Sequence, residues 1–250
     1  MTVPIPLLNT LAILRLLAIS LYRVFTRRWR FPEILASIVQ IGIGSLPIIT
    51  LATVFAGILV STEIAWHMDQ ALHSVEMIPG VTGQFILREL GIAIPALLMA
   101  SKAGAATAAE VGSMKVTEQI DALELLGIDA IDYLVVPRMV ASVFSLICLT
   151  LIAVTVTMAG AIGVAILRYQ FAWGEYVNAL RPFIEGKDLI AAVVKAGIFG
   201  AVIPVIACSF GLRCKGGAEG VGTATTDSVV ASTIAIIFLD FILTSFFIGL

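Results

Sequence analysis

The chain has 250 residues, of which 60% are hydrophobic and 13% are charged, and its mean hydropathy is +1.07. A soluble domain has about a quarter charged residues, so this composition indicates a protein whose main solvent is lipid. The formal net charge of −2 gives no electrostatic basis for binding nucleic acid.

The N-terminal apolar run, residues 5–25, has no basic residue before it and therefore does not resemble a signal peptide. It could cross the membrane, but Arg15 would then lie near the middle of the bilayer, at roughly 2.5–3.5 kcal/mol. A helical wheel places Asn9, Ser20, Arg23 and Arg27 on one side. We therefore expect residues 1–30 to form an amphipathic helix in the membrane plane. Its anchors to anionic headgroups would be Arg23, Arg27, Arg28 and Arg30.

Five later stretches are long enough to cross about 30 Å of hydrocarbon as helices. They lie near 37–62, 85–109, 139–167, 189–211 and 228–249, and the second is the weakest because Arg88, Glu89 and Lys102 lie near its ends. Spans must be helices or closed barrels, since lipid offers no hydrogen-bond partners, and alternating strands of about ten residues are absent from the sequence. The fold class is therefore an all-α integral membrane protein, with one domain over 1–250.

The distribution of Lys and Arg predicts the orientation of the spans. A cytoplasmic N-terminus places most of these residues inside, namely Arg15, Arg23, Arg27, Arg28, Arg30, Lys102, Lys115, Arg138, Arg213 and Lys215. The outer segments then hold Arg88, Arg168, Arg181, Lys187 and Lys195. The bias favours a cytoplasmic N-terminus and a C-terminus on the far side.

Two loops carry residues that superficially suggest ligand sites. His67 and His73 flank Asp69 in an expected outer loop, and we interpret them as solvated residues rather than metal ligands. Gly216, Gly217, Gly220 and Gly222 are expected to form a flexible cytoplasmic turn before the last span. This turn lacks the strand and the lysine of a phosphate-binding loop. The three cysteines, Cys148, Cys208 and Cys214, have no C-x-x-C spacing and are interpreted as small apolar residues.

A short acidic helix is predicted between the second and third spans, in the sequence VTEQIDALELLGID (Val116 to Asp129). Thr117 is a candidate N-cap and Gly127 is suited to the left-handed position that ends a helix, so the helix would cover 117–127. Ile120, Leu123 and Leu126 form a small apolar stripe flanked by carboxylates. The helix is either an ordinary connector or a docking helix whose stripe enters a groove of a partner.

Two ionisable residues, Lys195 and Asp240, lie inside the fourth and fifth spans, where such groups are usually paired or line a cavity. Their distances from the span ends place them at depths that differ by roughly 5 Å at 1.5 Å per residue. We predict that they pair directly or through water; the alternative is that each contacts hydroxyl or backbone groups nearby. Arg88 and Glu89 begin the second span, where simple interfacial anchoring is the alternative to a binding role.

Two long blocks resemble the MlaE/YrbE permease family, including its cyanobacterial and chloroplast branch. They read LRELGIAIPALLMASKAGAATAAEVGSMKVTEQIDALELLGIDAIDYLVVPRMVA (Leu87–Ala141) and GGAEGVGTATTDSVVASTIAIIFLD (Gly216–Asp240). This chain departs from the family pattern at Lys102, Thr223 and Asp227, where arginine is common, and at Ala130, where proline is usual.

The resemblance implies the permease subunit of an ATP-driven phospholipid transporter. The implied partners are a second copy of this chain, a cytoplasmic ABC ATPase, an MCE-domain substrate-binding protein and phospholipid. The coupling helix to the ATPase would be formed by Glu118, Gln119, Asp121, Ala122 and Leu123. Lipid would bind between two copies, near Val60, Arg88 and Glu89 at the outer ends of the first two spans.

No cofactor or metal is expected on this chain, because ATP and Mg²⁺ would bind the ATPase and the sequence has no G-x-x-x-x-G-K-[ST] motif. The implied location is a bacterial inner membrane, or alternatively the chloroplast inner envelope. A solitary secondary transporter would favour an inverted repeat, and none is evident. A lipid-modifying membrane enzyme would need a nucleophile–base or metal constellation, which two histidines and scattered carboxylates do not supply.

Overall fold

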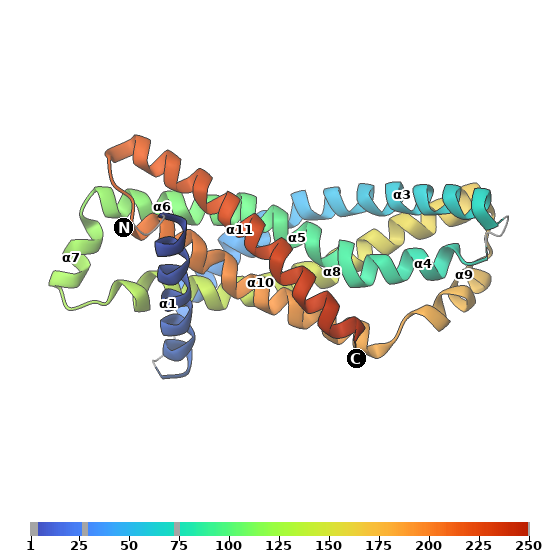
Figure 1. The fold of residues 1–250 in the computed structure, drawn as a ribbon, viewed down its shortest axis with the longest axis horizontal. Coiled ribbons are helices and arrows are strands. Elements are labelled where there is room, and N and C mark those ends of the chain that lie inside the picture. The colour runs from blue at the N-terminus through green and yellow to red at the C-terminus, as the bar shows by residue number, and fades with distance from the viewer. Residues whose placement is uncertain (1–4, 27–29, 73–75, 250) are drawn as a thin grey trace. The chain divides into compact units, whose positions relative to one another are not determined.

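The computed structural model describes residues 5–26, 30–72 and 76–249, and within these ranges it contains helices and no strand (Figure 1). The α-helices are α1 (Ile5–Thr26), α2 (Phe31–Ile38), α3 (Gly44–Leu72), α4 (Ile78–Phe85), α5 (Gly91–Met99), α6 (Ala105–Val116), α7 (Gln119–Leu125), α8 (Val136–Tyr169), α9 (Trp173–Leu180), α10 (Gly186–Leu212) and α11 (Gly217–Ile248). Four π-helical turns, η1 (Val39–Ile43), η2 (Ile86–Leu90), η3 (Ala100–Gly104) and η4 (Ile131–Val135), and the 3-10 turn η5 (Arg181–Phe183) join them.

Five helical segments of the described chain are long and apolar enough to cross a membrane. They are Phe31–Gln70, Ile78–Val116, Ile131–Tyr169, Gly186–Leu212 and Gly217–Phe247. The N-terminal helix α1 is not among them. The all-α membrane class is therefore confirmed, while the in-plane orientation of α1 stays a prediction.

Two of the π-helical turns, η1 and η2, have a local cause in the sequence. Pro47 and Pro95 lie four and five residues after the ends of η1 and η2. Proline cannot donate a backbone hydrogen bond and clashes with the carbonyl one turn before it, so a wider turn accommodates it. Directly after η1, Lys102 donates to the carbonyl of Gly44.

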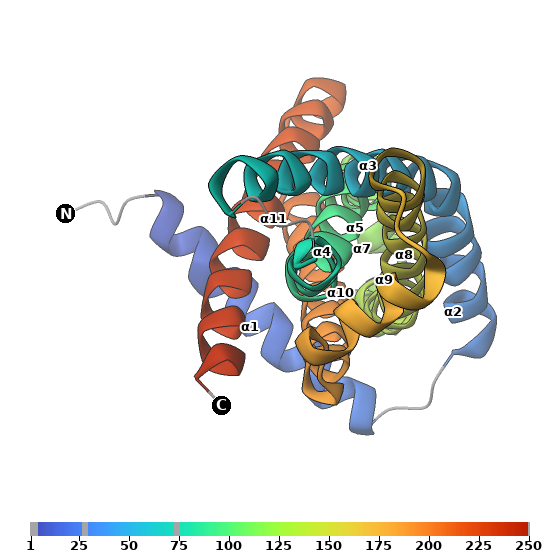
Figure 2. The same cartoon turned by 90° about the vertical axis from the view of Figure 1, so that its right-hand side faces the viewer.

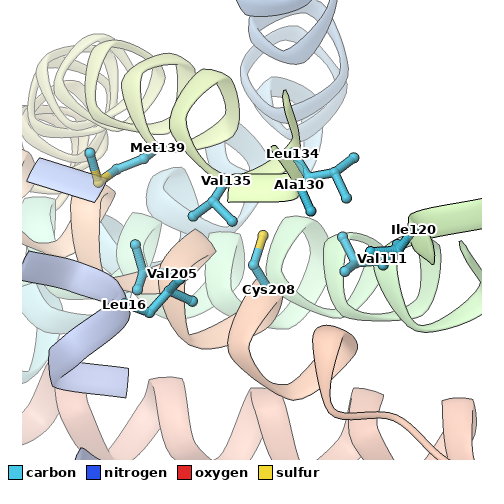
Figure 3. Packing of buried hydrophobic residues seen from close by; sticks show 9 residues of the cluster. All are labelled: Leu16, Val111, Ile120, Ala130, Leu134, Val135, Met139, Val205 and Cys208. Carbon is cyan, nitrogen blue, oxygen red and sulfur yellow. The ribbon is translucent and has the colours of Figure 1, made fainter. Parts of the chain in front are cut away.

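Contacts divide the chain into two compact units, each assembled from segments of several spans. The first consists of Met1–Ser45, Leu97–Leu146 and Gly197–Leu239, and the second of Leu46–Ala96, Ile147–Ala196 and Asp240–Leu250. Figure 3 shows the core of the first unit, a cluster of side chains from α1, α6, α7, α8, α10 and the turn before α8. Its members are Leu16, Val111, Ile120, Ala130, Leu134, Val135, Met139, Val205 and Cys208.

In the second unit, helices approach one another through small residues. A Cβ on Gly57 would lie 2.1 Å from the carbonyl oxygen of Thr157, and one on Gly160 would lie 2.8 Å from that of Val54. Glycine at these two positions therefore lets α3 and α8 pack backbone to backbone. On the same unit α4 packs against α9 (Figure 2).

Two sequence expectations about loops are wrong. His67 lies within α3 rather than in a loop. The glycine-rich segment turns only at Gly216 and Gly217, where φ is positive, and α11 already begins at Gly217. Gly220 is helical and has a structural role, because a Cβ there would lie 1.8 Å from the carbonyl oxygen of Lys215. Arg27, Arg28 and His73 lie outside the described residues.

Candidate functional site

A cluster of charged side chains lies in the second unit, where η2 faces α10 and α11. The wide turn η2 presents Arg88 and Glu89, α10 contributes Asp188 and Lys195, and α11 contributes Asp240. The sequence analysis selected all of these except Asp188. That residue precedes Lys195 by seven positions and so shares its face of the helix, which is a usable signal.

Lys195 is at the centre of the cluster, with only 2% of its side chain exposed. Its Nζ lies 2.8 Å from Asp240 Oδ1 and donates to Thr244 Oγ1 at 2.6 Å, to the Arg88 carbonyl at 3.0 Å and to Glu89 Oε1 at 3.3 Å. The structure thus places the two predicted partners, Lys195 and Asp240, together. These three hydrogen bonds already match the three donors of an ammonium group, so Asp240 acts on Lys195 mainly through its charge.

Thr244 connects the cluster further. It accepts from Lys195, and its hydroxyl donates to Glu89 Oε1 at 2.8 Å. Sequence reasoning missed this residue, although it follows Asp240 by four positions and therefore lies on the same side of α11. The signal in the sequence was a hydroxyl side chain one helical turn after an intramembrane carboxylate.

Arg88 is held by groups of its own unit. Its Nε lies 2.8 Å from Asp188 Oδ1, and the other oxygen of Asp188 accepts the backbone N–H of Glu185 at 3.0 Å. With its amide oxygen turned toward Arg88, Gln84 accepts from the guanidinium at 3.0 and 3.2 Å. The Arg88 side chain remains 28% exposed, so part of its donor capacity is open to a ligand.

The cavity beside this cluster is small. It measures about 20 Å³ and is lined by Arg88, Glu89, Asp188, Ala191, Lys195, Thr244 and Phe247. That is room for about one water molecule, so this cavity in a single copy cannot enclose a phospholipid headgroup. Val60 is half-buried on α3 and is not among the lining residues.

The predicted short helix is present as α7 but begins later than expected. Thr117 is wrong as the N-cap: it ends α6, and its hydroxyl donates to the carbonyl of Ser113 at 2.8 Å. The chain turns instead at Glu118, which adopts the left-handed conformation at φ 59° and precedes the first residue of α7. Because only two residues separate α6 from α7, the backbone must turn sharply between them. A left-handed residue produces such a turn, whereas a capping side chain alone does not.

The end of α7 is as predicted. Gly127 has φ 76°. Its N–H donates to the backbone carbonyl of Glu124 at 2.9 Å, and the N–H of Ile128 donates to the backbone carbonyl of Leu123 at 3.0 Å. This pair of bonds is the Schellman arrangement, which stops a helix at a left-handed glycine. The helix is thus defined at both ends.

The predicted apolar stripe of α7 is divided, because Ile120 points into its own chain whereas Leu126 is exposed. Ile120 is 3% exposed and belongs to the core cluster of the first unit (Figure 3). The apolar residues free for a partner are instead Leu125 and Leu126, which are 90% and 76% exposed. Of the predicted coupling residues, Leu123 is half-buried, whereas Glu118, Gln119, Asp121 and Ala122 are exposed. Asp121 is paired with Lys115 at 2.7 Å.

Comparison with known proteins shows the family to which the chain belongs. The family model described as Permease MlaE matches residues 34–246, which include both the charged cluster and α7. The chain belongs to the MlaE permease family.

The relatives agree with this family. A probable ABC transporter permease protein of Rickettsia bellii is 35% identical over 217 residues, 87% of this chain and 83% of that protein. A probable ABC transporter permease protein of Synechocystis sp. is 37% identical over 204 residues, 82% of this chain and 77% of the relative. Protein TRIGALACTOSYLDIACYLGLYCEROL 1, chloroplastic, of Arabidopsis thaliana is 36% identical over 219 residues, 88% of this chain and 62% of that protein.

This MlaE-family chain is therefore a multi-pass permease subunit of an ABC transporter. An ABC permease works in general with an ATPase and a substrate-binding component.

Proposed function

We propose that this chain is the transmembrane permease of an ATP-driven phospholipid transporter, which moves lipid between its membrane and an MCE-domain protein on the far side. The observation that carries the proposal is family membership over residues 34–246. The name of the Arabidopsis relative, which contains that of a galactose-bearing glycerolipid, supports a lipid as cargo.

The charged cluster around Lys195 is the proposed substrate end of the permease. Because its cavity of about 20 Å³ is too small for a headgroup, a second copy of the chain would have to complete a lipid cavity. Arg88 would face the anionic phosphate of the lipid, with Glu89 adjusting the charge of the site and Val60 contributing apolar surface. The partly exposed guanidinium of Arg88 is suited to phosphate because its donors form a planar fork.

The proposed ATPase end is α7. Its exposed carboxylates and the exposed side chains of Leu125 and Leu126 offer a small amphipathic surface to a groove lined with basic residues. ATP and Mg²⁺ would bind the partner, and α7 would receive its movement. The membrane is a bacterial inner membrane, or alternatively a chloroplast inner envelope, with the N-terminus in the cytoplasm.

The test is a mild-detergent pull-down of the tagged chain from its native membrane, followed by mass measurement of the intact complex. We expect two copies of the chain, an ATPase, an MCE-domain protein and bound phospholipid. A chain that emerges without an ATPase under several gentle conditions would contradict the proposal and favour a transporter that works alone.

A paired variant tests the role of α7. Replacing Leu125 and Leu126 with Ser should reduce the recovered ATPase by about tenfold or more, since each buried leucine contributes about 1.5–3 kcal/mol, while the second copy is retained. Trp173→Ser is the matched control, because Trp173 is also apolar and 62% exposed but lies on α9. Equal loss of ATPase in both variants would show that α7 has no special role.

A further inference from the structure

The N-terminal helix α1 is attached to the segment that follows α7. Nη1 of Arg23 lies 2.6 Å from Asp129 Oδ1 and 2.9 Å from Asp132 Oδ1, so that one nitrogen contacts two carboxylates. The Arg23 side chain is only 19% exposed. Arg23 therefore faces the protein, whereas the sequence analysis assigned it to lipid headgroups.

The position of Asp129 makes this contact mechanically significant. Asp129 comes two residues after Gly127, the glycine that follows the end of α7. Its Oδ1 also accepts the backbone N–H of Ile131 at 2.8 Å, at the start of η4. Asp132 lies within η4, which continues directly into α8. The two carboxylates therefore occupy the chain junction between α7 and the third span, which adds to the packing of Ile120 in the core cluster.

The junction contains a glycine that no neighbouring side chain packs against. Gly127 has a positive φ, and nothing lies within 4 Å of the position of a Cβ there. Glycine is the residue with the greatest backbone freedom. The bridge from Arg23 therefore adds a side-chain tie to the junction beyond Gly127, next to the packing of Ile120 in the core cluster.

The same face of α1 also belongs to the core of the first unit. Leu16 belongs to the core cluster that contains Ile120 (Figure 3), and Ser20 between Leu16 and Arg23 is fully buried. Spacings of four and three residues place Leu16, Ser20 and Arg23 on one side of a helix. One face of α1 thus packs in the core cluster of the first unit and contacts the junction after α7.

The opposite face of α1 is apolar and exposed. Leu11, Leu14, Tyr22 and Phe25 are 62%, 60%, 69% and 86% exposed and follow helical spacing. A helix with such a stripe is retained at a membrane surface. Through this stripe α1 would be held by lipid on one side while it holds the α7–α8 junction on the other.

We infer that Arg23 is a positioning residue for energy coupling: its bridge to Asp129 and Asp132 makes α1 and the α7–α8 junction move as one body, so that displacement of α7 reaches the third span. This inference rests on the proposed function, because it assumes that an ATPase acts on α7. It assigns α1 a part in transmission in addition to membrane anchoring.

The first experiment measures coupling in the reconstituted complex of permease, ATPase and substrate-binding protein. In Arg23→Ala, lipid transferred per ATP hydrolysed should fall about two- to thirtyfold, the range found for mutations along coupling networks, while ATP hydrolysis continues. Arg15→Ala is the matched control, since it removes the same charge from the exposed side of the same helix. An unchanged ratio in Arg23→Ala, or an equal loss in Arg15→Ala, would overturn the inference.

A charge exchange separates coupling from folding. Arg23→Asp combined with Asp129→Arg should recover part of the lipid transferred per ATP relative to Arg23→Asp alone, because opposite charges again meet at the junction. A purely structural role would instead change the yield of assembled complex and leave the ratio per assembled complex constant. That result would also overturn the inference.

A second measurement does not depend on transport. Spin labels at Arg15→Cys and Leu125→Cys, with Cys148, Cys208 and Cys214 replaced by Ala, report the distance between α1 and α7. We expect one narrow distance distribution with Arg23 present and a broad one in Arg23→Ala. Equally narrow distributions would refute the bridge, whereas absence of ATP-driven lipid transfer by the unmodified complex would refute the proposed function and leave this distance result standing.

Discussion

At the scale of single residues, the buried ammonium of Lys195 shows how a charge is accommodated within a span. A lone charge away from water is costly, and Lys195 is surrounded by two carboxylates, a hydroxyl and a backbone carbonyl. Removing one partner of such a group leaves the other uncompensated, which is more damaging than removing both.

A double-mutant cycle on Lys195 and Asp240 follows from this geometry. Lys195→Met and Asp240→Asn should each destabilise the solubilised protein by about 3–5 kcal/mol, the cost of breaking a buried pair, and the double variant should lose less than the sum. Thermal unfolding in detergent measures all three. The exposed pair of Lys187 and Glu185, 3.2 Å apart, is the control and should contribute at most about 1 kcal/mol. Additive losses at Lys195 and Asp240 would show that the two residues act independently.

The Arg23 bridge makes a prediction about pH. The guanidinium of Arg23 lowers the pKa of Asp129 from its ordinary value of 3.8. A lowered folded-state pKa stabilises the folded protein above pH 3.8, and this contribution disappears as the pH falls through the lower folded-state value.

The stability difference between the unmodified chain and Asp129→Asn should therefore stay constant from pH 7 to about pH 4.5 and shrink only below about pH 4. Unfolding midpoints measured across this range would test it. A difference that already shrinks between pH 7 and pH 5 would mean that another group dominates the stability of the junction.

At the scale of elements, glycine determines how closely two helices pack. Gly57 and Gly160 let α3 and α8 approach until a Cβ would overlap a carbonyl oxygen of the facing helix. Gly163, on the same helix as Gly160, has open space at its Cβ position. Identical residues on one helix thus differ completely in what their substitution would do.

Gly57→Ala and Gly160→Ala should each lower the stability of the solubilised protein by about 1–3 kcal/mol, because added atoms must push a backbone aside. Gly163→Ala should be neutral or stabilising by up to about 1 kcal/mol, since it only reduces backbone freedom in the unfolded chain. Thermal unfolding in the same detergent compares the three. A loss at Gly163 equal to that at Gly57 would indicate a general intolerance of alanine rather than close packing.

At the scale of the whole molecule, the spans differ in how much of their surface the chain itself covers. The most apolar windows of the first and last spans are 22% and 11% buried, against 50–56% for the other three. The first and last spans therefore present most of their surface to lipid or to the predicted second copy.

The predicted orientation can be read in intact cells. In a chain whose three native cysteines are replaced by Ala, Glu175→Cys on α9 should react with a membrane-impermeant maleimide from outside. Glu124→Cys on α7 should react only after the membrane is opened, because the excess of Lys and Arg keeps its side in the cytoplasm. The reverse labelling pattern would place the N-terminus outside and exclude a cytoplasmic ATPase on α7.

The class and the family of this protein follow from its amino-acid sequence. Long apolar runs in a chain with 13% charged residues permit only spanning helices, since lipid cannot satisfy open backbone groups. The left-handed glycine at 127 and the intramembrane location of Lys195 and Asp240 were also readable, because each depends on local chain geometry or on depth along a helix.

Which side chains meet could be learned only from the folded chain. Thr117 failed as a cap because the turn between α6 and α7 occurs at Glu118, and Ile120 faces inward because it completes a core made by five other segments. Arg23 is 106 residues before Asp129, and no local pattern connects them. Helix periodicity predicts which residues share a face of a helix. Which segment packs against that face depends on contacts between residues distant in sequence, and these contacts are determined by packing.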